Sequence, residues 1–299
     1  MTSIDPVALV HRDQPPEVAA RFARIYARPV ILEVDQLCRR FAGEQGEVTA
    51  LQDIAFRTHR RELMCVIGPS GCGKSTLARV LAGLDEPSAG RVLLDGQPVR
   101  GPGPDRGMVF QGYTLFPWRT VLQNVMFGLE VRGRDRSAAE SEALEWVEIV
   151  GLSKFADAYP YQLSGGMKQR VAIARALANK PRILLMDEPF AALDAQTRAQ
   201  MQGYLLELWR QIDITIVFIT HDLEEAVYLA DRIVVLGTNP GHVREIVEVP
   251  LLRPRSREII VDPRFVATKR YLESLIHSDP PEPELRPRIR MTQIGDEVD

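Results

Sequence analysis

The sequence is poor in cysteine and lacks long apolar runs. Its three cysteines, Cys38, Cys65 and Cys72, cannot all pair within one chain. The first residues show no basic region followed by an apolar stretch, so we expect no secretory signal and reduced thiols in the cytosol. No uncharged apolar run reaches the roughly 18 residues that cross a bilayer. We therefore expect any work at a membrane to be done through a partner.

The sequence also lacks an excess of charge of one sign. It has 37 Lys and Arg against 40 Asp and Glu, a formal net charge of −3. A dedicated nucleic-acid binder usually shows a basic excess or a basic stripe, so the balance argues against that class. With 45% hydrophobic residues over 299 positions, the chain is too apolar to be disordered and can bury a sizeable core.

The ends of the chain differ in composition from its middle. Residues 1–29 mix proline, charge and short apolar pieces, and predict a partly disordered arm with a short helix ending near Ala27. Residues 238–277 predict an extension packed on the main domain, with a helix over 265–276. Residues 278–299 are rich in proline and charge and predict a disordered tail.

Between these ends, strand and helix patterns alternate. Short apolar runs predict buried strands, and spacings of three and four residues between apolar positions predict the helices between them. Buried strands that alternate with amphipathic helices indicate a mostly parallel sheet covered on both faces. Residues 112–163 carry few strand signals and predict a helical insertion. Four apolar runs carry the strand prediction: 63–67, 183–186, 214–220 and 233–236.

The strongest local signal is a glycine-rich loop between a predicted strand and a predicted helix. It fits the pattern G-x-x-x-x-G-K-[ST], in which backbone N–H groups and the start of a helix cradle phosphates. Lys74 adds a full positive charge to the β- and γ-phosphates, and the Ser75 hydroxyl can bind Mg²⁺. A glycine-rich turn with an exposed lysine is the alternative, and the correct flanks argue against it. The loop comprises Gly68, Pro69, Ser70, Gly71, Cys72, Gly73, Lys74, Ser75 and Thr76.

A second element is an apolar strand ending in two carboxylates, Asp187 and Glu188. Ligands bind at the carboxyl ends of strands in open α/β sheets, and neighbouring residues on a strand point to opposite sides. We expect Asp187 to hold Mg²⁺ through its outer shell and Glu188 to polarise an attacking water. Alone, the pair would be a solvated strand end; after the phosphate loop, it predicts a nucleoside triphosphatase that uses ATP and Mg²⁺.

A third element, Leu163-Ser-Gly-Gly-Met-Lys-Gln-Arg170, precedes a predicted helix. Ser164 is a natural N-cap, and Gly165 and Gly166 leave N–H groups open, which makes a second anion site. At this point the sequence resembles the ATP-binding-cassette (ABC) ATPases, whose signature is similar to LSGGQ. The resemblance covers roughly residues 30–237, with the motifs in family order, and Met167 stands where many members have glutamine.

The resemblance implies roles for four further residues. Phe41 matches the aromatic residue that stacks on adenine, and Gln111 matches the glutamine that reaches the metal and the attacking water. Asp194 matches the loop that crosses to a partner subunit, and His221 matches the histidine that touches the γ-phosphate. Singly, they would be read as a core aromatic, a surface glutamine, a helix N-cap and a hydrogen-bonded histidine at a strand end.

The resemblance also implies a fold and an assembly. The fold is α/β: a RecA-like P-loop NTPase core with a mostly parallel sheet, an antiparallel β subdomain and an inserted α-helical signature subdomain. Two copies pack head to tail and hold ATP between one copy's phosphate loop and the other's signature helix. Closure of the dimer on ATP and its release after hydrolysis would drive the work. Lys74, Gln111, Glu188 and His221 would be the catalytic residues.

Three functional classes share such a core. A two-cassette translation factor is disfavoured because the chain has one phosphate loop and one signature. A DNA-maintenance ATPase, the remaining alternative, typically has long coiled coil between the glutamine loop and the signature, and none is present here. The aromatics Tyr113, Phe116 and Trp118 after Gln111 favour a transporter, because this stretch resembles the loop of importer ATPases that receives a coupling helix from the membrane subunit. Internal anchoring of the helical insertion is their other reading.

The lack of fused membrane segments favours an importer, whose subunits are commonly separate chains. Within importers, residues 115–118, 159–160 and 250–255 resemble the nitrate, sulfonate and taurine subfamily. The implied partners are a second copy, a multi-span permease and, indirectly, an extracytoplasmic solute-binding protein, with no nucleic acid. The implied location is the cytoplasmic face of the plasma (inner) membrane, as a peripheral subunit.

Overall fold

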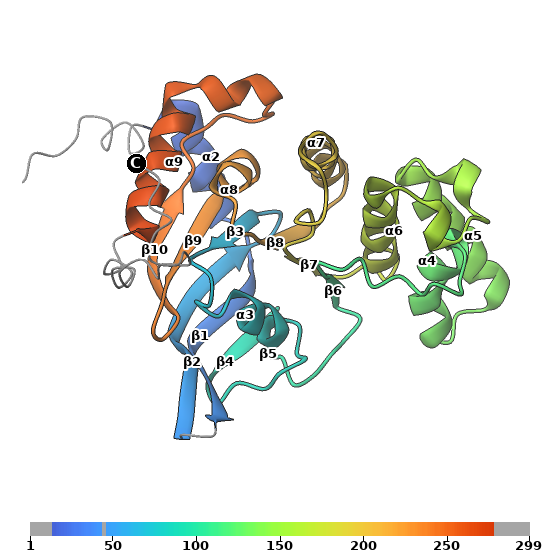
Figure 1. Cartoon of the computed structure of the whole chain (residues 1–299), viewed down its shortest axis with the longest axis horizontal. Coiled ribbons are helices and arrows are strands. Elements are labelled where there is room, and N and C mark those ends of the chain that lie inside the picture. The colour runs from blue at the N-terminus through green and yellow to red at the C-terminus, as the bar shows by residue number, and fades with distance from the viewer. Residues whose placement is uncertain (1–13, 44–45, 278–299) are drawn as a thin grey trace, which may run out of the picture.

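The computed structural model describes residues 14–43 and 46–277. The predicted disorder of residues 1–13 and 278–299 lies outside these ranges. Figure 1 shows a body built on two sheets and, at the right, a lobe made of helices. The helix α7 (Ala195–Gln211) lies between the two.

The main sheet has six strands in the order β10-β9-β3-β8-β7-β6. Five run parallel, and β10 pairs with β9 in the antiparallel sense. The prediction of a mostly parallel sheet is therefore confirmed, including its four predicted strands. The bounds are β3 (Leu63–Ile67), β6 (Arg106–Val109), β7 (Ile183–Asp187), β8 (Thr215–Ile219), β9 (Arg232–Gly237) and β10 (His242–Glu248).

The second sheet is antiparallel, with the strand order β2-β1-β4-β5. Its long hairpin joins β1 to β2 and contains several register shifts. A turn at Asp95-Gly96 joins β4 to β5, and both residues have positive φ, as a two-residue hairpin requires. The strands are β1 (Val30–Gly43), β2 (Gly46–His59), β4 (Ala89–Leu94) and β5 (Gln97–Pro98).

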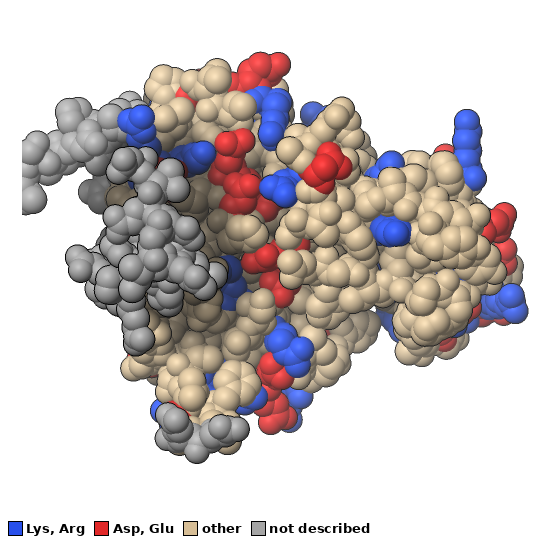
Figure 2. Space-filling model, viewed as in Figure 1, with Lys and Arg blue, Asp and Glu red and all other residues tan. Residues whose placement is uncertain are grey.

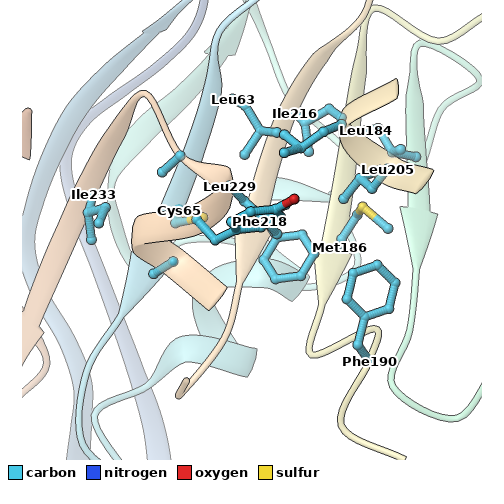
Figure 3. Packing of buried hydrophobic residues seen from close by; sticks show 14 of the residues in the cluster. Leu63, Cys65, Leu184, Met186, Phe190, Leu205, Ile216, Phe218, Leu229 and Ile233 are labelled. Atoms are coloured by element: carbon cyan, nitrogen blue, oxygen red, sulfur yellow. The ribbon is translucent and has the colours of Figure 1, made fainter. Parts of the chain in front are cut away.

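Two layers of apolar side chains cover the faces of the main sheet. Along β3, Leu63 and Cys65 face one cluster, while Met64 and Val66 face the other, as the two-residue period of a strand dictates. In Figure 3, Cys65 lies beside Phe218, its partner in the strand register. Full burial of each such side chain contributes about 1.5–3 kcal/mol. The helices that flank the sheet include α3 (Lys74–Leu81), α7 and α8 (Leu223–Leu229).

The helical lobe has a core of its own, lined by Val125, Ala143 and Val171 among others. A capping box between Thr120 and Gln123 begins its first helix. The lobe includes the residues of the predicted helical insertion, 112–163. Its members are α4 (Val121–Val131), α5 (Arg136–Ile149), the 3₁₀ turns η1 (Ser153–Phe155) and η2 (Pro160–Gln162), and α6 (Gly165–Leu177).

An N-terminal helix, α2 (Pro16–Tyr26), is tied to the C-terminal segment that follows β10. Arg21 donates hydrogen bonds to the carbonyls of Val249 and Leu251. The same C-terminal region contains η3 (Arg257–Val261) and α9 (Pro263–Ile276), where a helix was predicted. Residues far apart in the chain therefore meet at this end of the sheet.

A fully buried carboxylate, Asp231, holds that junction together. It accepts hydrogen bonds from the Leu63 N–H at 3.1 Å and from Arg253 Nε at 2.8 Å, and lies 3.8 Å from Arg21 Nε. Burial acts to raise the pKa of Asp231, but the nearby Arg253 and Arg21 guanidiniums outweigh it, so the pKa lies below its ordinary value. Its ionised form is therefore more stable in the fold than in the unfolded chain.

Replacing Asp231 by Asn leaves buried arginines without their counter-charge. We expect Asp231→Asn to lower the free energy of unfolding by about 3–5 kcal/mol, measured by urea denaturation. The contribution of Asp231 is complete above the unfolded-state pKa of about 3.9, and is lost as the pH falls through the lower folded-state pKa. The control Asp213→Asn breaks an exposed pair with Arg60 and should cost less than about 1 kcal/mol. An equal loss of unfolding free energy in the two variants would contradict the view that the buried carboxylate contributes more than the exposed one.

Candidate functional site

The phosphate loop lies between β3 and α3 and is closely packed. Gly73, with φ of +90°, caps the start of α3; a Cβ there would come within 2.6 Å of Leu51 Cδ2. A Cβ on Gly68 would come within 2.7 Å of Cys72 Sγ and 2.8 Å of the Leu236 carbonyl oxygen. Packing of the loop against its neighbours therefore favours glycine at positions 68 and 73, whereas at Gly71, where a Cβ would meet nothing within 4 Å, the reason is the φ of +80°.

Lys74, the first residue of α3, turns its side chain over this loop. Its Nζ donates hydrogen bonds to the carbonyls of Gly68 at 2.8 Å and Pro69 at 2.9 Å. Only 8% of the residue is exposed. The ammonium charge is therefore held at the loop by the loop's own backbone.

Asp187, the last residue of β7, meets Ser75 from α3. Burial raises the pKa of the Asp187 carboxyl, with a smaller rise from Glu188, whereas a hydrogen bond with Ser75 and the charge of Lys74 act to lower it; the result lies above the ordinary value. One carboxylate oxygen of Asp187, Oδ1, is buried without a hydrogen-bond partner. An unpaired carboxylate oxygen beside a hydroxyl is a donor set that Mg²⁺ accepts, so these residues fit that ion.

Glu188 follows the strand in a left-handed conformation, with φ of +45°. Its N–H donates to the Ile219 carbonyl at 2.9 Å, and its Oε2 lies 3.1 Å from His221 Nδ1. Asp187 and Glu188 thus have different neighbours, as expected from the sequence. The physical reason differs, because the strand ends at Asp187 and the left-handed turn, rather than the strand pleat, directs Glu188.

Gln111 lies on the exposed loop after β6, at the same edge of the sheet. Val109 pairs with Met186 in the β6–β7 register, so the residues after Val109 run beside those after Met186. Further along the loop, Tyr113 and Thr114 have φ of +57° and +50°. Their carbonyls accept hydrogen bonds from Arg175 on α6, a residue that the sequence analysis did not single out because nothing in its local sequence signals this distant contact.

The signature residues form a separate group at the start of α6. Ser164 caps this helix by accepting a hydrogen bond from the Met167 N–H at 3.3 Å. A Cβ on Gly165 would come within 2.9 Å of Leu193 Cδ2, and one on Gly166 would come within 2.9 Å of Thr197 Cγ2. A larger residue at either position would force the Leu193 or Thr197 side chain to shift, because α6 begins in tight contact with α7 and the loop before it.

Asp194 caps α7 and accepts a hydrogen bond from the Thr197 N–H at 2.9 Å. That bond lowers the pKa of the exposed Asp194 carboxyl. In Figure 1, α6 lies in the helical lobe at the right, whereas α3 lies against the sheets of the body. A Cβ on Gly165 or Gly166 would meet Leu193 or Thr197, on either side of Asp194, so the signature lies close to Asp194, whereas α6 and α3 lie in different parts of the molecule.

Phe41 stands apart from both groups, near the tip of the β1–β2 hairpin. It is 38% exposed, so the reading as a core aromatic does not apply. The guanidinium of Arg39 lies 4.4 Å from the centre of its ring. Sequence reasoning missed Arg39, although alternation along β1 puts residues 39 and 41 on one face.

Comparisons with known proteins identify the family of the chain. The family described as "ABC transporter" matches residues 51–191. An uncharacterized ABC transporter ATP-binding protein of Methanocaldococcus jannaschii is 56% identical over 77% of this chain and 86% of its own length. The nitrate import ATP-binding protein NrtD of a Synechocystis species is 47% identical over 82% and 94%, and the taurine import ATP-binding protein TauB of Pseudomonas entomophila is 46% identical over 83% and 97%.

Solved structures give the same result for the fold. An ATP-binding cassette solved as a dimer in a post-hydrolysis state, with ADP and Pi, has a TM-score of 0.64 and 32% identity, and the match covers 73% of this chain and 99% of that one. The chain belongs to the ATP-binding proteins of ABC transporters. It is an ATPase of the P-loop fold that binds ATP.

The packing around Gly73 predicts a sharp loss on substitution. In Gly73→Ala, the methyl group meets Leu51 and the positive φ costs about 1–2 kcal/mol, so we expect ATP affinity to fall roughly tenfold, measured with a fluorescent ATP analogue. The control is Gly203→Ala inside α7, where a Cβ meets nothing within 4 Å. Unchanged ATP affinity in Gly73→Ala would contradict the assignment of a tight loop.

Proposed function

We propose that this chain is the ATP-hydrolysing subunit of an importer for nitrate, taurine, a sulfonate or a related small solute. The observation that carries the proposal is that relatives named for nitrate and taurine import match more than four fifths of the chain and nearly all of their own length. A relative in Bacillus cereus is named for aliphatic sulfonates and is 43% identical over 76% of this chain. The domain would span residues 30–237, with the helical insertion at about 112–163 and the extension at 238–277.

In the proposed catalytic site, the residues divide the work. Lys74 and the N–H groups of the loop Gly68–Thr76 bind the β- and γ-phosphates. Ser75, Gln111 and Asp187 hold Mg²⁺, which neutralises phosphate charge when bound. Phe41 stacks on adenine, and the Arg39 guanidinium would have to share or leave the ring.

Glu188 is the proposed general base. Its carboxylate takes the proton of the attacking water. His221, whose Nδ1 lies 3.1 Å from Glu188 Oε2, orients this carboxylate and reaches the γ-phosphate. The left-handed backbone at Glu188 supports this role, because such strain persists mainly where surrounding structure enforces it at functional sites. Gln111 positions the same water from the neighbouring strand end.

A second copy completes the site in this proposal. The starts of α3 and α6 are two anion-binding helix ends in different parts of the chain, so one nucleotide does not bridge them within one copy. Head-to-tail pairing sets Ser164, Gly165 and Gly166 of one copy against the ATP of the other, with Asp194 crossing between them. The dimeric state of the solved cassette with ADP and Pi supports this assembly.

The general-base role predicts a separation of binding from turnover. We expect Glu188→Gln to retain ATP affinity while kcat falls by about 10²–10⁴-fold, and to accumulate as a dimer in MgATP on size-exclusion chromatography. The matched control is Glu224→Gln, which removes an exposed carboxylate that lies near Arg257 and Lys269. Turnover like that of the unmodified protein in Glu188→Gln would remove Glu188 from the role.

A groove between the helical lobe and β6 is the proposed docking site for the permease. Its volume is about 480 Å³, and its lining includes Phe116 and Phe127, whose ring centres lie 4.6 Å apart. Next to it, Trp118 is 72% exposed. The charged residues that line the groove are Arg106, Arg132 and Arg175, with no Asp or Glu among the lining residues. We propose that an amphipathic helix of the permease, carrying an acidic residue, lies here.

In this arrangement the subunit lies peripherally on the cytoplasmic face of the membrane, and the solute-binding protein acts on it only through the permease. No helix in residues 14–43 and 46–277 combines the length and apolarity of a membrane span. A DNA-maintenance role has no support among the relatives. On the face drawn in Figure 2, acidic and basic side chains are interspersed instead of forming a basic stripe.

The docking proposal predicts a local effect of charge. Val131 lines the groove and is 70% exposed, so Val131→Asp should abolish co-purification with the permease from detergent-solubilised membranes. The control is Val261→Asp in η3, at a valine that is 77% exposed and outside the groove lining. Thermal melting checks that both variants are folded. Retention of the permease by Val131→Asp would contradict this location, and recovery with DNA would overturn the importer assignment.

A further inference from the structure

Arg175 makes an unusual set of contacts with the loop that carries Gln111. Its Nη1 donates to the Thr114 carbonyl at 2.7 Å, and its Nη2 donates to the Thr114 hydroxyl at 2.9 Å and to the Tyr113 carbonyl at 3.3 Å. A planar guanidinium is suited to this task because its donors form a rigid fork. One side chain therefore fixes two successive carbonyls of the loop.

The loop needs such a fixture. Tyr113 and Thr114 are consecutive residues in the left-handed region, and neither is glycine. This conformation is a genuine outlier for a β-branched residue such as threonine, and it persists only where the surroundings enforce it. Among the contacts of the loop, the bonds from Arg175 act directly on the two strained residues. Without them, the backbone between Gln111 and Phe116 would relax towards ordinary conformations.

The charge of Arg175 has no acidic partner in the described part of the chain: no Asp or Glu there forms a salt bridge with it. Burial lowers the pKa of the Arg175 guanidinium. The polar partners of the guanidinium are the two carbonyls and the Thr114 hydroxyl, and the centre of the Phe116 ring lies 5.6 Å away. Arg175 and Phe116 also line the docking groove. The same side chain thus borders the groove on one side and the Gln111 loop on the other.

We propose that Arg175 is the positioning residue that sets where Gln111 stands relative to the γ-phosphate, by clamping Tyr113 and Thr114 to α6. The proposal rests on the role of Gln111 given above and extends it to a residue that touches neither nucleotide nor metal. It also makes α6 a rigid connection between the signature and the Gln111 loop, because the helix begins at Gly165 and carries Arg175 in its last turn. Contact with a docked helix would reach Gln111 through this clamp.

The clamp acts on turnover more than on nucleotide binding, because Arg175 makes no hydrogen bond with the phosphate loop and, of the proposed Mg²⁺ ligands, its loss displaces only Gln111. We expect Arg175→Gln to lower kcat about tenfold while the KM for ATP stays within twofold of the unmodified protein. Arg175→Lys keeps the charge but loses the fork, and should recover part of the lost turnover. Both are measured on the full chain by steady-state ATP hydrolysis, with thermal melting to verify folding.

A double-mutant cycle with Gln111→Ala distinguishes positioning from general damage. If Arg175 acts through Gln111, the double variant Gln111→Ala/Arg175→Gln turns over no more slowly than Gln111→Ala alone. Losses that multiply in the double variant would overturn the proposal. Should Arg175→Gln fail to fold, the same cycle is run with Arg175→Lys.

Arg61 offers a matched control. It is also partly exposed, and its Nη2 donates to two successive carbonyls, those of Trp209 at 3.3 Å and Arg210 at 3.0 Å, at the far end of α7. Arg61→Gln should leave kcat within twofold of the unmodified protein. A loss equal to that of Arg175→Gln would show that any arginine tied to carbonyls matters equally, and would overturn the specific role.

The cycle also separates this inference from the proposed function. Normal turnover in Gln111→Ala would show that Gln111 has no catalytic role, and would therefore reject both the proposed role of Gln111 and its positioning by Arg175. Impaired turnover in Gln111→Ala, together with multiplied losses in the double variant, would reject Arg175 alone. Neither result depends on the permease, so failure of co-purification leaves the test of the clamp intact.

Discussion

The order of strands in the parallel sheet is the constraint on which the site depends. Because β3, β8 and β7 are neighbours and run in one direction, their carboxyl ends meet at a single edge. The phosphate loop, the carboxylates at 187–188 and His221 are each the continuation of one of these strands. Residues more than 100 positions apart therefore meet without any loop having to reach across the molecule.

The helical lobe adds a second centre of organisation, which is α6. Its start packs closely on α7 and the preceding loop, so that a Cβ on Gly165 or Gly166 would press on Leu193 or Thr197. Its later turns hold the loop between β6 and α4 through Arg175. A rigid helix with contacts at both ends transmits displacement, whereas a flexible segment would absorb it. This gives a physical basis for linking the signature to the Gln111 loop.

The sequence predicts those features of the fold that are encoded by neighbouring residues, and it does not predict those that depend on distant ones. The four apolar strands and the glycine loop are each encoded by consecutive residues, and the sequence predicts them correctly. The strand β10 was missed because its burial does not alternate. In β2, burial alternates only over residues 54–58, while the first half is mostly exposed and crosses register shifts. The contacts of Arg21 with Val249 and Leu251 and of Arg175 with Tyr113 and Thr114 depend on tertiary neighbours, which no local pattern encodes.

Backbone strain is concentrated in the loops at the carboxyl edge of the parallel sheet. Tyr113, Thr114 and Glu188 all have positive φ, at a cost of about 1–2 kcal/mol each. Charge-assisted hydrogen bonds from Arg175, at about 1.5–3 kcal/mol each, are large enough to hold the first two. The difference between the strain energy and the hydrogen-bond energy is small. It is less than the roughly 5.5 kcal/mol that reverses a two-state population from 1:99 to 99:1. Loops held in this way can change conformation when a nucleotide or a docked helix alters a single contact, while the sheet beneath them stays fixed.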